Sequence, residues 1–236
     1  MKVQESVALV TGANRGLGRA FVQALLEAGA ARVYAAARDP SGIASGDRVV
    51  PVRLDIRSPQ DADRAAALYG DVNLLVNNAG VAHPVGSLDP RSLLVARDEW
   101  ETNVSGPLRL IQKFAPILAA NGGGAVLNVL SALTWISIPG AFGTYAASKA
   151  ALWSLTNSLR LDLQAQGTQV AALHVGFMDT DFIKGMSVPK TAPRVVAHDA
   201  LAQLEAGAVE ILADQVSQQL KQHLNAGVYL RAPQLG

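Results

Sequence analysis

Cysteine is absent from this chain of 236 residues. Disulfides, thiolate nucleophiles and cysteine-ligated metals are therefore excluded. Charge is also sparse, because only 17% of the residues are charged and the formal net charge is +1. Bulk electrostatics therefore predict neither a nucleic-acid partner nor a membrane partner. The low charged fraction also suggests that much of the surface is covered, including by contacts between subunits.

Histidine clusters and long hydrophobic runs are missing as well. The four histidines lie far apart and show no metal-ligand spacing, so we predict no metal site. No run is long enough to cross a bilayer, and the N-terminus lacks the long apolar core of a signal peptide. We therefore expect a cytoplasmic protein.

Hydrophobic sequence is abundant and arranged in short runs. Half of the residues are hydrophobic, which is enough for one large core. No proline-, serine- or charge-rich linker interrupts the chain, so we predict one domain over residues 1–236. Strand-like runs alternate with longer segments of helical pattern. These runs start near Val7, Arg32, Arg48, Val72, Gly124 and Thr168.

The strand-like runs are continuously apolar, which is typical of strands that are covered on both faces. Their alternation with helices predicts an α/β fold of the Rossmann type, doubly wound, with six to seven mostly parallel strands and helices on both faces. We expect a helical region at about 91–121, as one helix or two, and another helix over 143–163. Ligands of such sheets bind beyond the carboxyl ends of the strands.

The segment "TGANRGLG", residues 11–18, lies between the first predicted strand and the first predicted helix. Its glycines permit a tight turn and the close approach of a pyrophosphate. Free backbone N–H groups and the helix dipole favour such an anion. A glycine turn that binds nothing is the alternative, but this context favours a nucleotide site. The expected contacts are Gly12, Asn14, Arg15, Gly16, Leu17 and Gly18.

The end of the second strand indicates which nucleotide is bound. NAD-selective proteins usually place an acidic residue there for the ribose 2′-OH, whereas this chain has Ala37 and then Arg38. Arg38 and Arg15 together suit a 2′-phosphate, so we predict NADP(H). Asp39, followed by Pro40, is interpreted as a turn former. The alternative is that both arginines lie in solvent and bind no phosphate.

Tyr145 and Lys149 stand four residues apart on the helix expected over 143–163, so they share one helix face. A free phenol has a pKa of about 10, and a nearby ammonium and the positive nicotinamide of an oxidised cofactor lower that pKa by favouring the phenolate. Such a pair can exchange a proton with a carbonyl or alcohol oxygen. The pair alone is a weak motif, since it also arises by chance.

In combination, these motifs resemble the classical short-chain dehydrogenase/reductase family over nearly the whole chain. The motifs come in the family's order and near its spacing. They are "TGANRGLG", Asp55 in "RLDI", "NNAG" at residues 77–80, Asn103, Ser131 and "YAASK" at residues 145–149.

The resemblance implies a catalytic tetrad of Asn103, Ser131, Tyr145 and Lys149. Tyr145 would act as the general acid or base, and Ser131 would bind the substrate oxygen. Lys149 would also hold the nicotinamide ribose, and Asn103 would position a water that links Lys149 to solvent. Each residue also has a purely structural interpretation. Ser131 would be a polar residue at a strand end, Asn103 a turn residue and Tyr145 a packing residue.

The resemblance also implies further cofactor contacts. Asp55 would meet the adenine edge, and Thr180 would bond the nicotinamide carboxamide. The segment 77–80 would support the sheet and pass its backbone beside the cofactor. The complete implied set beyond the glycine turn is Arg38, Asp55, Ile56, Asn78, Ala79, Gly80, Tyr145, Lys149, Gly176 and Thr180.

Three features depart from the family pattern. The spacing from Ser131 to Tyr145 is one residue longer than the commonest one. Val175 stands where the family usually has proline before Gly176. The C-terminus lacks the usual Asp-Gly-Gly ending, so a seventh strand near Val228 is left open.

A substrate lid is implied at about residues 177–198. Apolar side chains of this lid and of the loop after Ser131 would bury an apolar or aromatic ketone or aldehyde. The alternative is that these apolar side chains belong to the ordinary core or to a surface that binds a partner. The predicted substrate contacts are Ser131, Trp135, Tyr145, Phe177, Met178 and Phe182, with Ile136, Ile138 and Phe142 nearby.

The sequence thus predicts an NADPH-dependent carbonyl reductase or alcohol dehydrogenase that acts on a small molecule. A sterol- or acyl-type dehydrogenase of the same family is one alternative. A regulatory protein that senses NADP(H) without turnover is another, although an intact tetrad argues against it. The resemblance also implies a homo-dimer or homo-tetramer, formed by the helices that start near Trp100 and Gly143.

Overall fold

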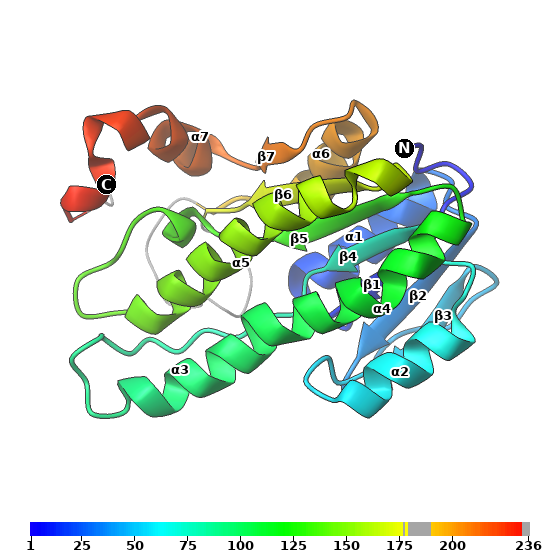
Figure 1. The fold of residues 1–236 in the computed structure, drawn as a ribbon, viewed down its shortest axis with the longest axis horizontal. Helices are drawn as coiled ribbons and strands as arrows, with labels where there is room; N and C mark the ends of the chain where they lie inside the picture. The colour runs from blue at the N-terminus through cyan, green and yellow to red at the C-terminus, as the bar shows by residue number, and fades with distance from the viewer. Residues whose placement is uncertain (177, 179–189, 233–236) are drawn as a thin grey trace.

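The computed structural model describes residues 1–176, 178 and 190–232. A seven-stranded sheet in the order β3-β2-β1-β4-β5-β6-β7 forms its centre, and every neighbouring pair is parallel (Figure 1). The predicted doubly wound Rossmann fold is therefore confirmed. The strands are β1 Val7–Thr11, β2 Arg32–Ala37, β3 Val49–Arg53, β4 Leu74–Asn77, β5 Ala125–Val129, β6 Gln169–His174 and β7 Glu210–Leu212.

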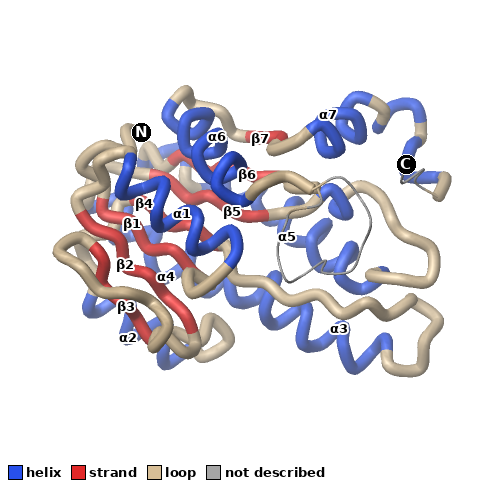
Figure 2. Tube along the Cα trace, turned by 180° about the vertical axis from the view of Figure 1, so that it is seen from behind, coloured by secondary structure: helices blue, strands red, loops and turns tan. Residues whose placement is uncertain are grey.

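Helices cover both faces of the sheet. Helices α1 and α6 pack together on one face, which Figure 2 shows, and α2, α4 and α5 lie on the other face, in front in Figure 1. The helices are α1 Gly16–Glu27, α2 Pro59–Leu68, α3 Ser92–Trp100, α4 Gly106–Ala120, α5 Gly143–Asp162, α6 Pro193–Glu205 and α7 Gln215–Gln222. No helix in the described ranges is long and apolar enough to cross a membrane.

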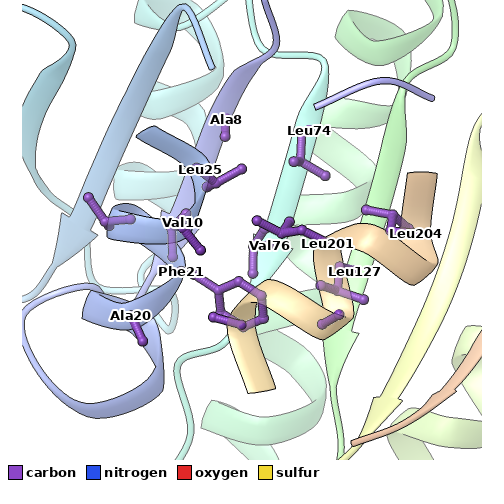
Figure 3. Packing of buried hydrophobic residues seen from close by; sticks show 14 of the residues in the cluster. Ala8, Val10, Ala20, Phe21, Leu25, Leu74, Val76, Leu127, Leu201 and Leu204 are labelled. Atoms are coloured by element: carbon purple, nitrogen blue, oxygen red, sulfur yellow. The ribbon is translucent and has the colours of Figure 1, made fainter. Parts of the chain in front are cut away.

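The continuous apolar runs are explained by two cores, one on each side of the sheet. In β1, Ala8 and Val10 face the core beneath α1 and α6, whereas Leu9 faces the core beneath α2 and α4. Successive strand residues point to opposite faces, so both sets must be apolar. Figure 3 shows Phe21 of α1 and Leu201 of α6 packed over the first of these cores.

The seventh strand is formed by residues other than those considered in the sequence. β7, Glu210–Leu212, pairs with β6, and its central Ile211 is fully buried. The segment Val228–Leu230 forms a 3₁₀ turn instead. It follows Gly227, whose φ is 73°, and its Tyr229 is 56% exposed. Since that turn directs its large side chains to solvent, it gains no burial in the sheet.

The helical region expected at about 91–121 is continuous. α3 and α4 are joined through a π-helical turn, Glu101–Ser105, whose flanking residues keep right-handed helical backbone. Such a turn accommodates one extra residue within a helix and is frequent at functional sites. Asn103 lies in this turn.

Candidate active site

A cavity of about 540 Å³ lies at the carboxyl ends of the strands. The loops that follow β1, β2, β4, β5 and β6 all contribute to its wall, as expected for a sheet whose order reverses between β1 and β4. Residues from the glycine turn and the Tyr145 helix line the same cavity. The topology therefore brings the two predicted halves of the site together.

The glycine turn is built for the close approach of a ligand's phosphates. Gly12 and Gly16 have φ values of 65° and 53°, which favour glycine. A Cβ on Gly18 would overlap the carbonyl oxygen of Gly12 and lie 2.6 Å from Asn78 Nδ2. Asn78 in turn donates to the Thr11 carbonyl at 2.9 Å. Strand β1, α1 and the loop after β4 therefore meet closely at Gly12 and Gly18, where a side chain would not fit, and the α1 N-terminus beside them suits a pyrophosphate.

Arg38 lies exposed on the cavity wall, and Arg15 occupies the N-cap of α1 on the same wall. Asp39 accepts a hydrogen bond from Ser41 N at 3.0 Å, which lowers the pKa of its carboxyl group. This local bond agrees with the interpretation of Asp39 as a turn former. The cavity lining thus carries the guanidinium groups of Arg15, at the start of α1, and of Arg38, directly after β2.

Asp55, which also lines the cavity, is held by Arg57. Arg57 donates from Nη2 to Asp55 Oδ2 at 2.8 Å and from Nε to Oδ1 at 3.1 Å. These bonds lower the pKa of Asp55, and the charge of Arg38 contributes to the same shift. Ile56 follows on the wall, and its carbonyl accepts from Arg109 at 2.7 Å. This part of the cavity wall therefore carries a carboxylate that is held in place by Arg57.

The turn at residues 77–80 is tied to β1 and β5. Thr11 Oγ1 accepts from the backbone N–H groups of Asn78 and Ala79, both at 3.0 Å. Asn77 Nδ2 donates to Asn128 Oδ1 at 2.9 Å inside the sheet. Asn78, Ala79 and Gly80 all line the cavity. The segment is thus positioned to support the sheet and to face a ligand.

Ser131, Tyr145 and Lys149 meet in the inner part of the cavity. Ser131 directly follows Leu130 after β5, and its side chain hydrogen-bonds Tyr145, which lies in the first turn of α5. Lys149 Nζ donates to the Val129 carbonyl at 2.9 Å and lies 5.7 Å from the centroid of the Tyr145 ring. The longer spacing between Ser131 and Tyr145 is absorbed by the intervening loop.

The pKa shifts of this pair are set by burial. Burial raises the pKa of Tyr145 to about 12, and the nearby Glu99 carboxylate adds to the increase, while the bond to Ser131 opposes it. Burial lowers the pKa of Lys149 to about 8. In the chain alone, desolvation of the phenolate outweighs the effect of the ammonium, and the lowering of the Tyr145 pKa beside an oxidised nicotinamide stays a prediction. Tyr145 is a protonated acid at neutral pH.

Asn103 fastens the loop after β4 to α5. Its side-chain oxygen accepts from Val81 N at 2.9 Å, and its Nδ2 donates to the Val81 carbonyl at 2.8 Å. Nδ2 also donates to Ser148 Oγ at 3.0 Å, beside Lys149 in the sequence. The side chain is therefore occupied by contacts within the chain, and its action on a water stays a prediction.

One part of the cavity lining is apolar. It includes Leu133, Ile136, Ile138, Phe142, Met178 and Val216. Met178 also pairs with Thr191 in an isolated parallel bridge. The predicted contacts Phe177, Thr180 and Phe182 lie outside the described residues. Val175 and Gly176 complete this part of the wall.

Two predictions about this part of the cavity need correction. Trp135 is absent from the cavity lining formed by the described residues, because its ring stacks on His174 at a centroid distance of 4.0 Å beneath Lys221. The lid predicted over 177–198 is too long, because residues from Pro193 onward belong to α6. Within that helix, Val196 and Ala197 are fully buried against the core.

Comparison with known proteins identifies the family. Residues 6–190 match the family model described as short chain dehydrogenase. The protein belongs to the short-chain dehydrogenase/reductase family. Among solved structures, this dehydrogenase is similar to a short chain dehydrogenase from Burkholderia cenocepacia J2315 in complex with NADP. The two chains are 38% identical, the match covers 96% of this chain and 95% of that one, and the TM-score is 0.91.

Two curated relatives of this protein have names that indicate different substrates. A cis-4-hydroxycyclohexanecarboxylate dehydrogenase from Sinomonas cyclohexanicum is 33% identical over 192 residues, covering 77% of each chain. A 3-oxoacyl-(acyl-carrier-protein) reductase FabG from Vibrio cholerae is 28% identical over 256 residues, covering 98% of this chain and all of that one. In the described part of this dehydrogenase, no cluster of three or more His, Asp or Glu side chains could hold a metal ion.

Sequence reasoning missed one buried carboxyl group of this dehydrogenase. Glu99 lies one turn before Asn103 and is 0% exposed. Its Oε1 accepts from His83 N at 2.8 Å, whereas Oε2 has no hydrogen-bond partner among the described residues. Its spacing of four residues before Asn103 places both side chains on one helix face, which is the signal that could have revealed it.

Replacing Glu99 by Gln should move the pH dependence of this dehydrogenase. The carboxylate raises the pKa of Tyr145, so removing the charge should lower that pKa. Because alcohol oxidation needs the Tyr145 phenolate, the rising limb of kcat/KM against pH should shift to lower pH. The falling limb of carbonyl reduction should shift in the same direction.

Asp98→Asn is the matched control for Glu99→Gln. Asp98 is the adjacent carboxylate, but its side chain is 38% exposed and pairs with His83 and Arg57. Its profile should coincide with that of the wild type. A Glu99→Gln profile that also coincides with the wild type would contradict the electrostatic coupling to Tyr145.

Proposed function

We propose that this protein is an NADPH-dependent oxidoreductase that interconverts a carbonyl compound and an alcohol, of the carbonyl reductase or alcohol dehydrogenase type. One observation carries the proposal. The hydrogen-bonded pair of Ser131 and Tyr145, with buried Lys149 beside it, lines the same cavity as the glycine turn. A proton donor and a nucleotide cradle in one cavity are the two requirements of this chemistry.

The cofactor would be held by residues along one wall. Gly12, Gly16 and Gly18 would let the turn approach its pyrophosphate, which would lie at the N-terminus of α1. Arg15 and Arg38 would bind the 2′-phosphate, and Asp55 would face the adenine. When bound, the nicotinamide supplies or accepts the hydride. The remaining contacts would come from Asn14, Leu17, Ile56, Asn78, Ala79, Gly80, Lys149 and Gly176.

In the reducing direction, Tyr145 gives the phenolic proton to the carbonyl oxygen as the carbonyl carbon gains hydride. The raised pKa of Tyr145 ensures that this proton is present at neutral pH. Ser131 donates to the same substrate oxygen and stabilises the charge that develops there. In the opposite direction, the phenolate of Tyr145 takes the alcohol proton.

Lys149 stabilises the phenolate that Tyr145 leaves behind. Its ammonium group is fully buried near the ring, and burial lowers its pKa only to about 8, so most molecules keep the charge at neutral pH. Its bond to the Val129 carbonyl fixes the position of Nζ. Asn103 keeps the adjoining loop in place through Val81.

The substrate would be an apolar or aromatic ketone or aldehyde. The described wall beside Ser131 is formed by aliphatic and aromatic side chains, with Lys149 as the buried cation. Such a wall favours a substrate without carboxylate or phosphate groups. The FabG relative supports the acyl-type alternative, in which the substrate would be larger.

A spectrophotometric screen of ketones and aldehydes with NADPH and NADH tests the function. We expect turnover with NADPH and a preference over NADH that Arg38→Ala reduces by about 10- to 100-fold, because hydrogen bonds to charged groups contribute about 1.5–3 kcal/mol. Arg19→Ala is the control, since Arg19 is an exposed arginine of α1 outside the cavity lining. A clear wild-type preference for NADH would contradict the assignment of Arg38.

The same screen separates the enzyme from a sensor. Tight binding of NADPH without turnover of any carbonyl compound would favour a regulatory protein. The intact set of Ser131, Tyr145 and Lys149 supports the enzyme, because a sensor needs no proton donor.

We also propose a cytoplasmic homo-dimer or homo-tetramer with a single domain over residues 1–236. The surface of α3 supports an assembly, since Leu93, Leu94 and Trp100 are 78%, 72% and 52% exposed. Exposed apolar surface often marks an interface.

A further inference from the structure

The helix α7 reaches the cavity from beyond the segment that the family model matches. The family match ends at residue 190, whereas α7 spans Gln215–Gln222. Val216, in its first turn, nevertheless lines the same cavity as Ser131 and Tyr145. Figure 1 shows α7 and the C-terminus on the side of the molecule where α5 begins, away from the N-terminus.

Asp214, the N-cap of α7, connects this helix to the cavity wall. Its Oδ1 accepts from Ser217 N at 2.8 Å, which caps the helix. Its Oδ2 accepts from Gly176 N at 2.6 Å. Both oxygens of one carboxylate are thus used, one for α7 and one for the turn after β6. Hydrogen bonds to a charged acceptor are stronger than those between neutral groups.

Gly176 allows this contact because it has no side chain. A Cβ at that position would lie 2.8 Å from Asp214 Oδ2 and 2.9 Å from Oδ1. The preceding residue, Val175, accepts from Ala132 N at 2.7 Å, directly beside Ser131. The Asp214 carboxylate therefore fixes the backbone of a turn that is itself bonded to the Ser131 loop.

The far end of α7 is fixed to the same region. Lys221 Nζ pairs with Glu210 of β7 at 2.6 Å. The ammonium also lies 5.3 Å from the Trp135 ring centroid and 5.9 Å from that of Trp153. Trp135 belongs to the loop after Ser131. Both ends of α7 therefore contact segments that shape the substrate end of the cavity.

We propose that the first turn of α7 is a specificity-determining wall of the reaction site, in which Val216 contacts the substrate and Asp214 is a positioning residue for Gly176. This inference rests on the proposed function, because the proposed function places the substrate in the part of the cavity near Val216. The apolar side chain of Val216 limits the size of the carbonyl compound. Asp214 keeps the Gly176 backbone in place beside Val175, which is bonded to the Ser131 loop.

The first test varies the size of Val216. The variants Val216→Ala and Val216→Phe are assayed with NADPH on ketones that range from short aliphatic to aryl compounds. We expect Val216→Phe to raise KM for the largest ketones about tenfold and Val216→Ala to lower it, because one methylene in an apolar pocket changes discrimination by about that factor or more.

Val209→Phe is the matched control, because Val209 is 41% exposed and lies outside the cavity lining. Its selectivity profile should equal that of the wild type. An unchanged size preference in both Val216 variants would overturn the assignment of Val216.

The second test measures binding without turnover. NADPH dissociation constants are obtained by fluorescence titration for Asp214→Ala and Ser217→Ala. Both variants weaken the cap of α7, but only Asp214→Ala releases Gly176 N. We expect Asp214→Ala to weaken NADPH binding about tenfold, the loss typical of a hydrogen bond to a charged group, and Ser217→Ala to leave it unchanged. Equal dissociation constants in the two variants would overturn the role of Asp214.

The two tests keep this inference distinct from the proposed function. If the wild type turns over no carbonyl compound, the proposed function fails, while the NADPH titration still tests Asp214. If the wild type is active and the Val216 series shows no size dependence, the inference about the wall fails and the function stands. Should Asp214→Ala not fold, the Val216 series decides alone.

Discussion

Tyr145→Phe should reduce kcat for carbonyl reduction by about 100- to 10,000-fold, the usual contribution of a positioned general acid. The substitution removes only the hydroxyl that hydrogen-bonds Ser131 and leaves the buried ring in place. The affinity for NADPH should therefore persist. Steady-state kinetics and a fluorescence titration of NADPH on the same preparation measure the two quantities separately.

The control for Tyr145→Phe is the same change at Tyr229, whose side chain is 56% exposed in the C-terminal region. Tyr229→Phe should match the wild type in kcat and in NADPH affinity. If Tyr145→Phe kept substantial turnover, another group would have to supply the proton, and the assignment of the acid would be wrong.

Gly18→Ala should both destabilise the protein and abolish NADPH binding. The added methyl group would overlap the Gly12 carbonyl and crowd Asn78 Nδ2. Overpacking of this kind costs about 1–3 kcal/mol of folding free energy, and relief requires α1 to move away from the turn. Since the cradle depends on that close approach, binding should fail even at temperatures where the variant is folded. Chemical denaturation and NADPH titration measure the two effects.

Gly42→Ala separates this effect from the general cost of replacing glycine. No atom lies within 4 Å of a Cβ built on Gly42. Its stability and NADPH affinity should equal those of the wild type. Tight NADPH binding by Gly18→Ala would show that the phosphates lie elsewhere.

Most of the fold could be predicted because burial leaves a strong pattern in the sequence. β1, β4 and β5 carry fully buried apolar residues on both faces, so their runs are conspicuous. β7 was missed because it has three residues, of which only Ile211 is fully buried. The segment near Val228 is more apolar but lies in a 3₁₀ turn. The sequence therefore leaves a strand near Val228 open and gives no signal for residues 210–212 as the last strand.

The site could be predicted where local chemistry identifies it, and less well where distant segments meet. The glycine turn and the Tyr145–Lys149 pair are each contained within a few residues. Val216 comes to the cavity only through the placement of β7 and α7, which no local pattern reveals. Trp135 was misplaced because an aromatic residue after Ser131 can point either to the cavity or, as found, to His174. The pKa of Tyr145 depends on burial, which a sequence does not report.

The π-helical turn at Glu101–Ser105 allows the continuous helix formed by α3 and α4 to pack against two different elements, α5 and the sheet. One extra residue offsets the helical phase by about 100°, since a regular helix has 3.6 residues per turn. The face that α3 directs to α5 with Glu99 is therefore not continued by the face that α4 directs to the sheet with Leu110 and Phe114. If α3 and α4 formed one regular helix, the orientation that directs α3 to α5 would turn Leu110 and Phe114 of α4 away from the sheet. Asn103 stands at this change of phase, where its amide can bind both Val81 and Ser148.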